Sequence, residues 1–216
     1  MQINLLKAVL FLYFIMPILG FSGVTVEPFY AFSLGATGQR LYINSKGQNV
    51  LEDFTAKANI YGLRLGYNYH GIMIGGEYFK KPKFTFREET TIVTNLGPAL
   101  AEFENKFEGR GYGAYIGYQA DNGFRFWYTK YLKQKYKDVD GSNSGDERNG
   151  DGWSIGVGCK AIHWLALNLQ ATKYSLNKGV SAGISGSIDP SYEITEWHIS
   201  ISFPFDIFNG ESYESY

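Results

Sequence analysis

Residues 109–118 read Gly-Arg-Gly-Tyr-Gly-Ala-Tyr-Ile-Gly-Tyr, and this stretch decides the fold. Its side chains alternate between two faces, which is the period of a β-strand. One face carries Tyr112, Ala114, Ile116 and Tyr118, while the opposite face is mostly glycine. A strand with one bulky apolar face and one face of minimal volume is predicted to turn its glycines toward a crowded space.

The same two-residue alternation recurs in seven other segments of the chain. Each is roughly ten residues long, which suits a strand that crosses a membrane at a tilt of about 45°. In each segment one face is bulky and apolar, whereas the other is small or polar with occasional charges. The predicted strands cover residues 25–34, 59–69, 72–79, 109–118, 124–131, 153–161, 164–173 and 193–205.

The glycine-rich face decides which side of these strands points inward. Glycines are unusual as a solvent surface but suit a narrow eight-stranded barrel, whose interior has room only for modest side chains. The bulky apolar face then points outward, where only lipid can cover it. Because an open edge would leave backbone groups unpaired in hydrocarbon, the sheet must also close. The alternative is a soluble ligand-binding barrel of the lipocalin type, which needs an apolar interior that the glycine-rich face disfavours.

The connections between the predicted strands alternate between long and short. Transmembrane barrels have short periplasmic turns, long extracellular loops and an even number of strands. We therefore predict an all-β fold, a closed eight-stranded antiparallel up-and-down transmembrane β-barrel with both ends in the periplasm. The short turns fall at residues 70–71, 119–123 and 162–163, and the long loops at residues 35–58, 80–108, 132–152 and 174–192.

Residues 1–22 have the layout of a secretory signal peptide. One lysine precedes an apolar run, and small residues end the segment at Gly20 and Ser22. We expect cleavage after Ser22; the alternative is an uncleaved anchor, because the run is almost long enough to span a bilayer. The barrel is then predicted over residues 23–205, followed by a short C-terminal periplasmic tail at residues 206–216.

The composition argues against several classes of function. The chain has 216 residues and a formal net charge of −1, whereas a generic nucleic-acid binder needs a strongly basic face. The single cysteine excludes a disulfide framework, and the three scattered histidines match no metal-binding motif. We therefore expect no cofactor, no metal and no nucleic-acid partner.

The closing segment, Trp197-His198-Ile199-Ser200-Ile201-Ser202-Phe203-Pro204-Phe205, alternates and ends on an aromatic residue. With the signal peptide and the eight strands, it makes the chain resemble the small eight-stranded outer-membrane barrels of the OmpA/OmpX type. The resemblance implies a monomer in a Gram-negative outer membrane, surrounded by outer-membrane lipids and lipopolysaccharide, with the barrel-assembly machinery as its partner during biogenesis. Here eleven residues follow the aromatic residue, too few for a peptidoglycan-binding domain.

Charged residues on the predicted inward face form the first candidate site. An unpaired ion in such an interior costs several kcal/mol, so these charges must pair. Three acids face three permanent bases, which favours a plug of ion pairs; a narrow gated pore or proton path is the alternative. The candidates are Glu27, Arg64, Glu77, Arg125, Lys160, Glu196 and His198.

Lysines that follow the upward strands form the second candidate site. A ring of ammonium groups at the outer membrane–water boundary is expected to meet the phosphates of lipopolysaccharide, as basic clusters meet anionic lipids. The alternative is ordinary solvated loop charge. The candidates are Lys80, Lys81, Lys83, Lys130, Lys133, Lys135, Lys137 and Lys173.

Aromatic residues are expected to form a girdle at each membrane boundary. The predicted inner girdle is Tyr61, Tyr67, Tyr69, Trp164, Phe203 and Phe205, and the predicted outer girdle is Tyr30, Tyr78, Tyr128 and Tyr192. The apolar strip 90–100 is expected to extend its flanking strands as a hairpin whose edge accepts a strand of another protein; a self-packed loop is the alternative.

The function predicted from these features is non-enzymatic: an integral outer-membrane barrel with an envelope-structural role and surface loops for interaction or adhesion. A lipid A-modifying enzyme, an acyl hydrolase or acyltransferase, is the alternative, because Glu196, His198 and Ser200 share one strand face. Neighbours on that face have Cα atoms roughly 6.5–7 Å apart, which makes hydrogen-bond reach marginal. We therefore assign no catalytic residue.

Overall fold

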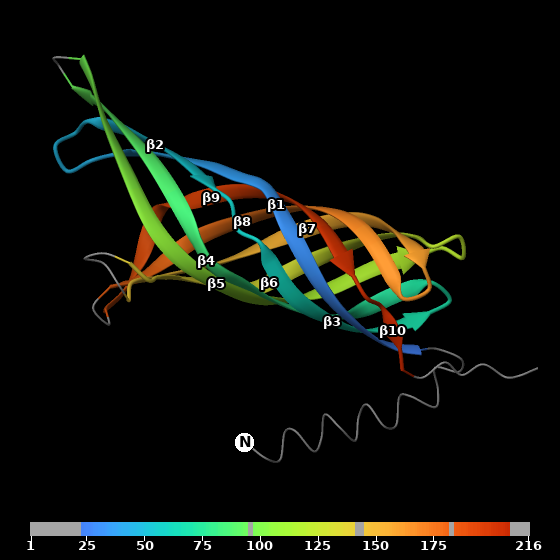
Figure 1. Cartoon of the computed structure of the whole chain (residues 1–216). Coiled ribbons are helices and arrows are strands. Elements are labelled where there is room, and N and C mark those ends of the chain that lie inside the picture. The colour runs from blue at the N-terminus through green and yellow to red at the C-terminus, as the bar shows by residue number, and fades with distance from the viewer. Residues whose placement is uncertain (1–22, 95–96, 141–144, 182–183, 208–216) are drawn as a thin grey trace, which may run out of the picture.

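The computed structural model describes residues 23–94, 97–140, 145–181 and 184–207. Residues 1–22 and 208–216, and with them the predicted signal peptide and most of the predicted tail, lie outside the described residues. Within the described chain ten strands form one antiparallel sheet (Figure 1). They are β1 (Gly23–Ile43), β2 (Asn49–Ala56), β3 (Ile60–Tyr69), β4 (Ile72–Thr94), β5 (Gly97–Gln119), β6 (Phe124–Asp138), β7 (Glu147–Ile162), β8 (Leu165–Ser181), β9 (Ile184–Ser202) and β10 (Phe205–Asp206).

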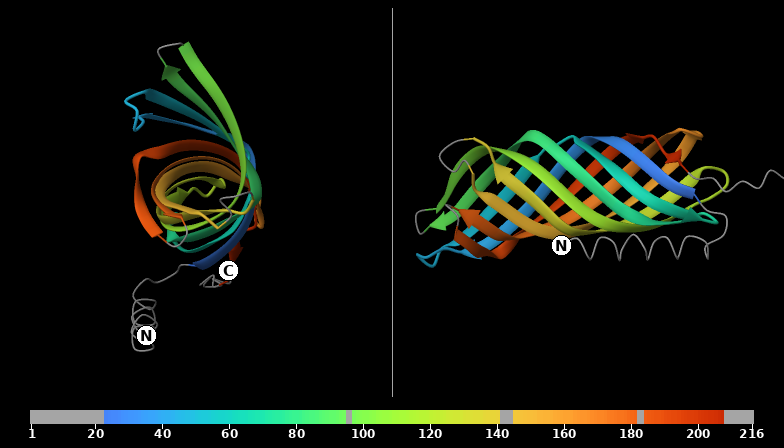
Figure 2. Two further views of the ribbon diagram at one scale, coloured as in Figure 1. Left: turned by 90° about the vertical axis from the view of Figure 1, so that its left-hand side faces the viewer. Right: turned by 90° about the horizontal axis from the view of Figure 1, so that it is seen from below.

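The sheet closes because β1 pairs with β9, with Phe29 opposite Ser202 and Gln39 opposite Glu193. β2 and β3 occupy one position in the ring, since β2 pairs with the upper parts of β1 and β4, and β3 with their lower parts. The short β10 continues the pairing along the lower end of β1. The ten strands occupy eight positions in the ring, because β2 and β3 share one position and β10 continues the position of β9. The described chain is therefore the predicted closed eight-stranded antiparallel barrel, which the left view of Figure 2 shows end-on.

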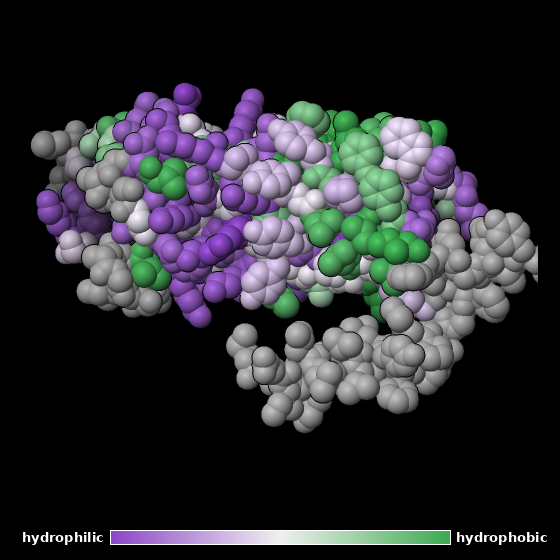
Figure 3. All heavy atoms as spheres, turned by 60° about the horizontal axis from the view of Figure 1, so that its bottom comes forward, coloured by the Kyte–Doolittle hydropathy of each residue, from purple (hydrophilic) through white to green (hydrophobic). Residues whose placement is uncertain are grey.

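Large apolar side chains form a belt on the outside of the barrel, as the alternation predicts. Leu65, Ile74 and Ile116 are each about half exposed, between 50% and 56%. Figure 3 shows this belt over one half of the molecule, with hydrophilic residues over the other half. Such a surface is stable only where lipid covers it. No helix in the described part of the chain has the length and hydropathy to cross a membrane.

Glycines face the lumen, where larger side chains from other strands need the space. A Cβ at Gly66 would lie 1.9 Å from the Tyr115 hydroxyl, and one at Gly156 would lie 2.1 Å from the Trp127 ring. Both distances are far below van der Waals contact, so only glycine fits. The glycine-rich face is thus the inner face.

The four long connections differ from prediction in being mostly strand. β4 and β5 pair continuously up to Thr94 and Gly97, and Thr90 lies opposite Ala101, so the strip 90–100 does form a hairpin. Alternation continues past the belt because the outward face there meets water and accepts charges such as Arg87 and Glu89. The β1–β2 and β4–β5 hairpins consequently project beyond the other strands (Figures 1 and 2).

Two aromatic residues lie away from their predicted girdles. Tyr61 pairs with Tyr30, because β3 runs downward and begins at the upper boundary; it therefore belongs to the outer girdle. Tyr192 is 7% exposed and points into the lumen, because β9 begins far above the belt. The exposed aromatic side chains at the upper boundary are Tyr30, Phe32, Tyr61, Tyr78, Tyr112, Tyr128, Trp153 and Trp197.

Candidate functional site

An ion network fills the lumen at the level of the apolar belt. Glu27, Arg64 and Glu77 lie opposite one another on β1, β3 and β4, and each is at most 5% exposed. Arg64 donates from Nη1 to Glu27 (3.0 Å) and from Nε to Glu77 (2.7 Å). Its guanidinium also lies over the rings of Phe29 and Trp127, with 4.6 and 4.5 Å to the centroids. Neighbouring strands thus place one cation between two carboxylates.

Arg125 on β6 joins this network from across the lumen. It donates to Glu27 through Nη1 (2.7 Å) and Nη2 (2.8 Å), the bidentate geometry that guanidinium and carboxylate prefer. Asn168 and Ser202 accept its remaining hydrogen bonds. Glu77 also accepts a hydrogen bond from the Tyr131 hydroxyl at 2.5 Å. Two carboxylates and two guanidinium groups balance here, so the network satisfies the condition for burying charge.

A second buried ion pair lies above the first and joins Lys81 to Glu196. His198 Nε2 lies 3.1 Å from the other oxygen of Glu196, and all three residues are 1% exposed. The Lys81 nitrogen also lies over the rings of Tyr136 and Tyr174, at 5.2 and 4.9 Å from their centroids.

Lys81 therefore corrects the prediction that placed it on the outer rim. The inward alternation of Glu77 and Phe79 continues through Lys81, because β4 does not end at the belt. The register shifts only after Lys81, before Phe84.

Lys160 lies at the lower mouth of the barrel, apart from both clusters. Its side chain is 15% exposed and its Nζ is 3.8 Å from Asp206 in β10. The prediction placed Asp206 in the tail, beyond the barrel. The first β1–β10 pair joins Thr25 to Asp206, which explains the position of this carboxylate.

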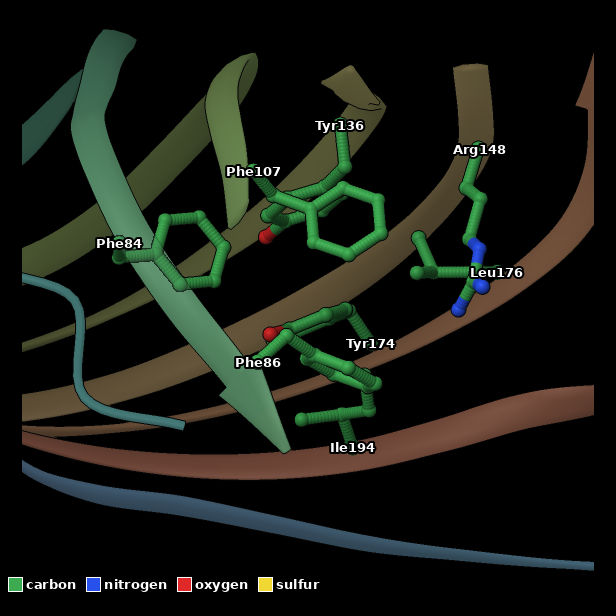
Figure 4. Close-up of a pocket in the computed structure, with 8 residues that line it drawn as sticks. All are labelled: Phe84, Phe86, Phe107, Tyr136, Arg148, Tyr174, Leu176 and Ile194. Atoms are coloured by element: carbon green, nitrogen blue, oxygen red, sulfur yellow. The ribbon is translucent and has the colours of Figure 1, made fainter. Parts of the chain in front are cut away.

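An aromatic cluster closes the lumen above the Lys81 pair (Figure 4). Tyr136 and Tyr174 stack with 5.5 Å between centroids, and the rings of Phe84, Phe86 and Phe107 pack around them. The residues around the remaining space are Phe84, Phe86, Phe107, Tyr136, Arg148, Tyr174, Leu176 and Ile194. That space is about 10 Å³, roughly enough for one water molecule. Side chains thus obstruct the lumen at three levels.

Charges near the top of the lumen come from the projecting hairpins and β7. Arg148 lies over the rings of Phe107 and Tyr192, at 5.2 and 4.6 Å from their centroids. Burial and the nearby Glu52 carboxylate raise the pKa of Glu88 above its ordinary value, although Arg148 opposes the shift. Sequence reasoning missed Arg148 because it assigned residues 132–152 to a loop.

Three of the predicted rim lysines are neutralised by carboxylates. Lys130 pairs with Asp151 (3.1 Å), Lys173 with Glu193 (2.9 Å) and Lys135 with Glu147 (2.5 Å). The remaining four are exposed and form no ion pair with any carboxylate of the described residues: Lys80, Lys83, Lys133 and Lys137.

The residues considered for catalysis face the lumen and not the lipid. His198 and Ser200 are each 1% exposed, and Glu196 is occupied by Lys81. A lipid acyl chain on the outer surface cannot reach them in this arrangement. Within the described ranges no three metal-binding side chains lie together.

Comparison with known proteins finds similar solved structures but no similar sequence. No protein-family model and no curated protein sequence matches the chain. Among solved structures, the chain is similar to the outer membrane protein OprG of Pseudomonas aeruginosa, at 10% identity and a TM-score of 0.48, covering 86% of this chain and 96% of that one. It is similar to Neisserial surface protein A (14%, TM-score 0.48, covering 85% and 99%) and to the outer membrane protein AlkL (12%, TM-score 0.45, covering 88% and 93%). All three identities are 14% or less, and all three TM-scores are below 0.5.

Proposed function

We propose that this protein is a non-enzymatic integral outer-membrane protein, whose obstructed barrel anchors a β-sheet that projects from the membrane to bind other molecules. The observation that carries the proposal is that the polar and apolar faces of the barrel are reversed relative to those of a soluble protein. Charged residues are paired inside, at Arg64 and Arg125, whereas large apolar residues face outward. Only a lipid environment makes that arrangement stable.

The packed lumen favours an anchor over a pore. A conducting path needs a continuous hydrated passage, but the two ion clusters and the aromatic cluster successively fill this one. The buried position of His198 and Ser200 likewise favours a non-catalytic role over lipid A modification. In this proposal the protein acts as a monomer, is exported by means of a cleaved signal peptide, and is inserted into the membrane by the barrel-assembly machinery.

Heat-modifiability of the full chain in a membrane fraction tests the anchor. A closed barrel resists detergent, so the unboiled protein should migrate differently from the boiled protein on a denaturing gel and be enriched in the outer membrane. Leu100→Cys, at a side chain 66% exposed, should react with an impermeant maleimide on intact cells. A soluble periplasmic protein without a mobility shift would overturn the proposal.

Among the described residues, β5 has no strand paired to one side of its upper part, which supports a role in binding. β6 pairs with β5 only as far up as Phe107, and the Lys106 carbonyl accepts the last hydrogen bond, from Val139. Since alternate residues of a strand direct their backbone groups to the same side, Leu100, Glu102 and Glu104 present theirs to the open side. An extended segment of another protein can add there as a further strand.

The charge of this edge indicates which partner fits. Glu102 and Glu104 lie on the outward face; Glu89 lies opposite Glu102 on β4, and Arg87 pairs with Glu104 at 3.4 Å. A second copy of the chain would bring carboxylates against carboxylates, which disfavours self-pairing. We therefore propose that the added strand comes from a protein segment with lysine or arginine at alternate positions and apolar residues between them. Its apolar residues would cover Phe103 on the inner face of the hairpin.

A synthetic Lys-Val alternating hexapeptide tests this edge. It should bind the nanodisc-embedded protein more weakly as salt is raised, whereas a Glu-Val peptide should not bind. Glu102→Pro removes one outward N–H without removing a β4 hydrogen bond and should abolish binding. Glu104→Gln should weaken it with the backbone intact. Undiminished binding to Glu102→Pro would contradict strand addition.

A further inference from the structure

We infer that the outer surface of β4, β5 and β6 carries a binding site for the phosphate group of a lipid. The site consists of Arg110 and Lys133, which line a hollow between two exposed tyrosines, and of Lys80, which lies opposite Arg110 on β4. It rests on the proposed membrane location. It specifies where, among the rim cations, an anionic lipid would bind.

The strand register brings cations together in one row, and Glu108, two residues from Arg110 on the same face of β5, lies in the next row opposite Lys137. Lys80 lies opposite Arg110, and Arg110 lies opposite Lys135, so three positive residues form one row across three strands. Of the three, Lys135 alone has a carboxylate partner among the described residues, Glu147 at 2.5 Å. Like charges directly opposite each other destabilise a sheet. A row of this kind is therefore stabilised by an anion bound to it.

The next row toward the membrane supplies hydroxyl groups and a further cation. Tyr78 lies opposite Tyr112, and Tyr112 lies opposite Lys133. Tyr78, Arg110, Tyr112 and Lys133 line a hollow of about 300 Å³ on the outer surface. Phenol hydroxyls and cations are the groups that hydrogen-bond phosphate oxygens. The two rows together form a donor-rich patch at the membrane boundary.

Two irregularities in the strands bracket this patch. The register shifts between Lys81 and Phe84 on β4, and between Tyr131 and Gln134 on β6. Each shift leaves two successive residues exposed on the outer side, Lys83 after Pro82 and Lys133 after Leu132. β-Bulges reorient side chains in this way beside binding sites. Here they add cations around Arg110.

Small residues below the patch leave room for an acyl chain. Gly76 lies opposite Ala114 on the outward face, and a Cβ at Gly76 would meet only one backbone oxygen, at 3.7 Å. Ile74 and Ile116 follow toward the membrane centre and are 50% and 56% exposed. A phosphate held by Arg110 would therefore direct its chain along an apolar path. This continuity favours a lipid over a free phosphate ion.

The rest of the rim provides a contrast. Lys130 and Lys173 are also exposed on the outer face, but Asp151 and Glu193 neutralise them. A general attraction to anionic lipid would use all rim lysines alike, whereas the proposed site uses only the cations without a carboxylate partner.

Native mass spectrometry of the full chain, released from non-ionic detergent micelles, tests the site. The micelles contain dipalmitoyl phosphatidic acid or dipalmitoyl phosphatidylcholine at equal concentration. We expect phosphatidic acid to be retained about tenfold more, the factor expected for one charge-assisted hydrogen bond. The double variant Lys80→Gln/Arg110→Gln should lose this preference, and the matched control Lys130→Gln/Lys173→Gln should keep it.

Two further measurements separate this site from a folding defect and from an ion site. Without lipid, Lys80→Gln/Arg110→Gln should unfold at the same or a higher urea concentration than wild type, because a repulsion is removed, and should keep its heat-modifiability. Inorganic phosphate should not compete with the lipid at equal concentration. Equal loss in both double variants would overturn the site, and equal binding of inorganic phosphate would overturn the lipid assignment. Neither result would alter the heat-modifiability that tests the anchor.

Discussion

Arg125 and Glu27 are joined by two hydrogen bonds of 2.7 and 2.8 Å across the lumen, although they lie 98 residues apart and on strands that are not neighbours. The pair braces β6 against β1. Backbone pairing holds each strand only to its neighbours, so side chains must provide any connection through the interior.

Glu27→Gln should destabilise the barrel by about 3–5 kcal/mol, because Arg64 and Arg125 both lose their shared buried carboxylate. Urea unfolding followed by tryptophan fluorescence and gel mobility measures this loss. As a control, Glu193→Gln breaks the exposed pair with Lys173 and should cost less than about 1 kcal/mol. Equal effects of the two substitutions would show that the network does not brace the lumen.

Lys81→Met should cost about 3–5 kcal/mol, because it leaves Glu196 as a buried carboxylate beside His198. Adding Glu196→Leu should recover most of the loss, since both charges are then absent. Lys80→Met, one residue away but outward, should change the free energy of unfolding by less than about 0.5 kcal/mol. A large loss of stability in Lys80→Met with none in Lys81→Met would show that Lys81 lies on the outer rim and not in the lumen.

Gly156→Val should destabilise by about 1–3 kcal/mol, because its side chain would overlap the ring of Trp127. Gly76→Ala faces outward, where its Cβ would make one ordinary contact, 3.7 Å from the Gly113 carbonyl oxygen, and should be neutral or slightly stabilising. Unfolding midpoints of the two variants give the comparison. If Gly156→Val were less destabilising than Gly76→Ala, the assignment of the inner and outer faces of the strands would be wrong.

Glu88 should make the projecting hairpin less stable as pH rises. Its raised pKa means that the folded hairpin favours the protonated acid, so the penalty is absent below the unfolded pKa and complete above the folded pKa. Hydrogen exchange of the upper β4 and β5 amides should therefore accelerate with pH more in wild type than in Glu88→Gln, after correction for the intrinsic rate. Identical corrected rates in the two proteins would contradict this.

The strands and their inward faces could be predicted because the physical cause is local. Alternation of glycine with tyrosine, as in residues 109–118, shows how much space is available on each side of the strand. This information lies within one segment and does not depend on which strands pair with it. The strand ends could not be predicted in the same way. Above the belt the outward face becomes charged, so residues 84–89 read as a loop even though their alternation continues.

The contacts of the lumen depend on how strands are staggered around the ring. Arg64 with Glu77 follows from one hairpin, but Arg125 with Glu27 and Lys81 with Glu196 depend on the register and closure of the whole barrel. The partner of Lys160 was missed for a related reason, because Asp206 belongs to a short strand that pairs beyond the end of β9. Inward charge is therefore visible in the sequence only within the predicted strands, so Lys81, just beyond one of them, was misplaced, and the pairing of these charges is not visible.

The pairing of β1 with β9 has a kinetic consequence. It joins the two ends of the described sheet, as when Phe29 meets Ser202, so almost the whole chain must be in place before the pair can form. Contacts of such high contact order form slowly, because the entropy of closing the intervening chain is lost before they contribute. Until closure, β1 and β9 each present an open edge on which other chains can add. The sheet that has not yet closed is therefore the aggregation-prone species. The rate at which β1 pairs with β9 sets how long that species persists.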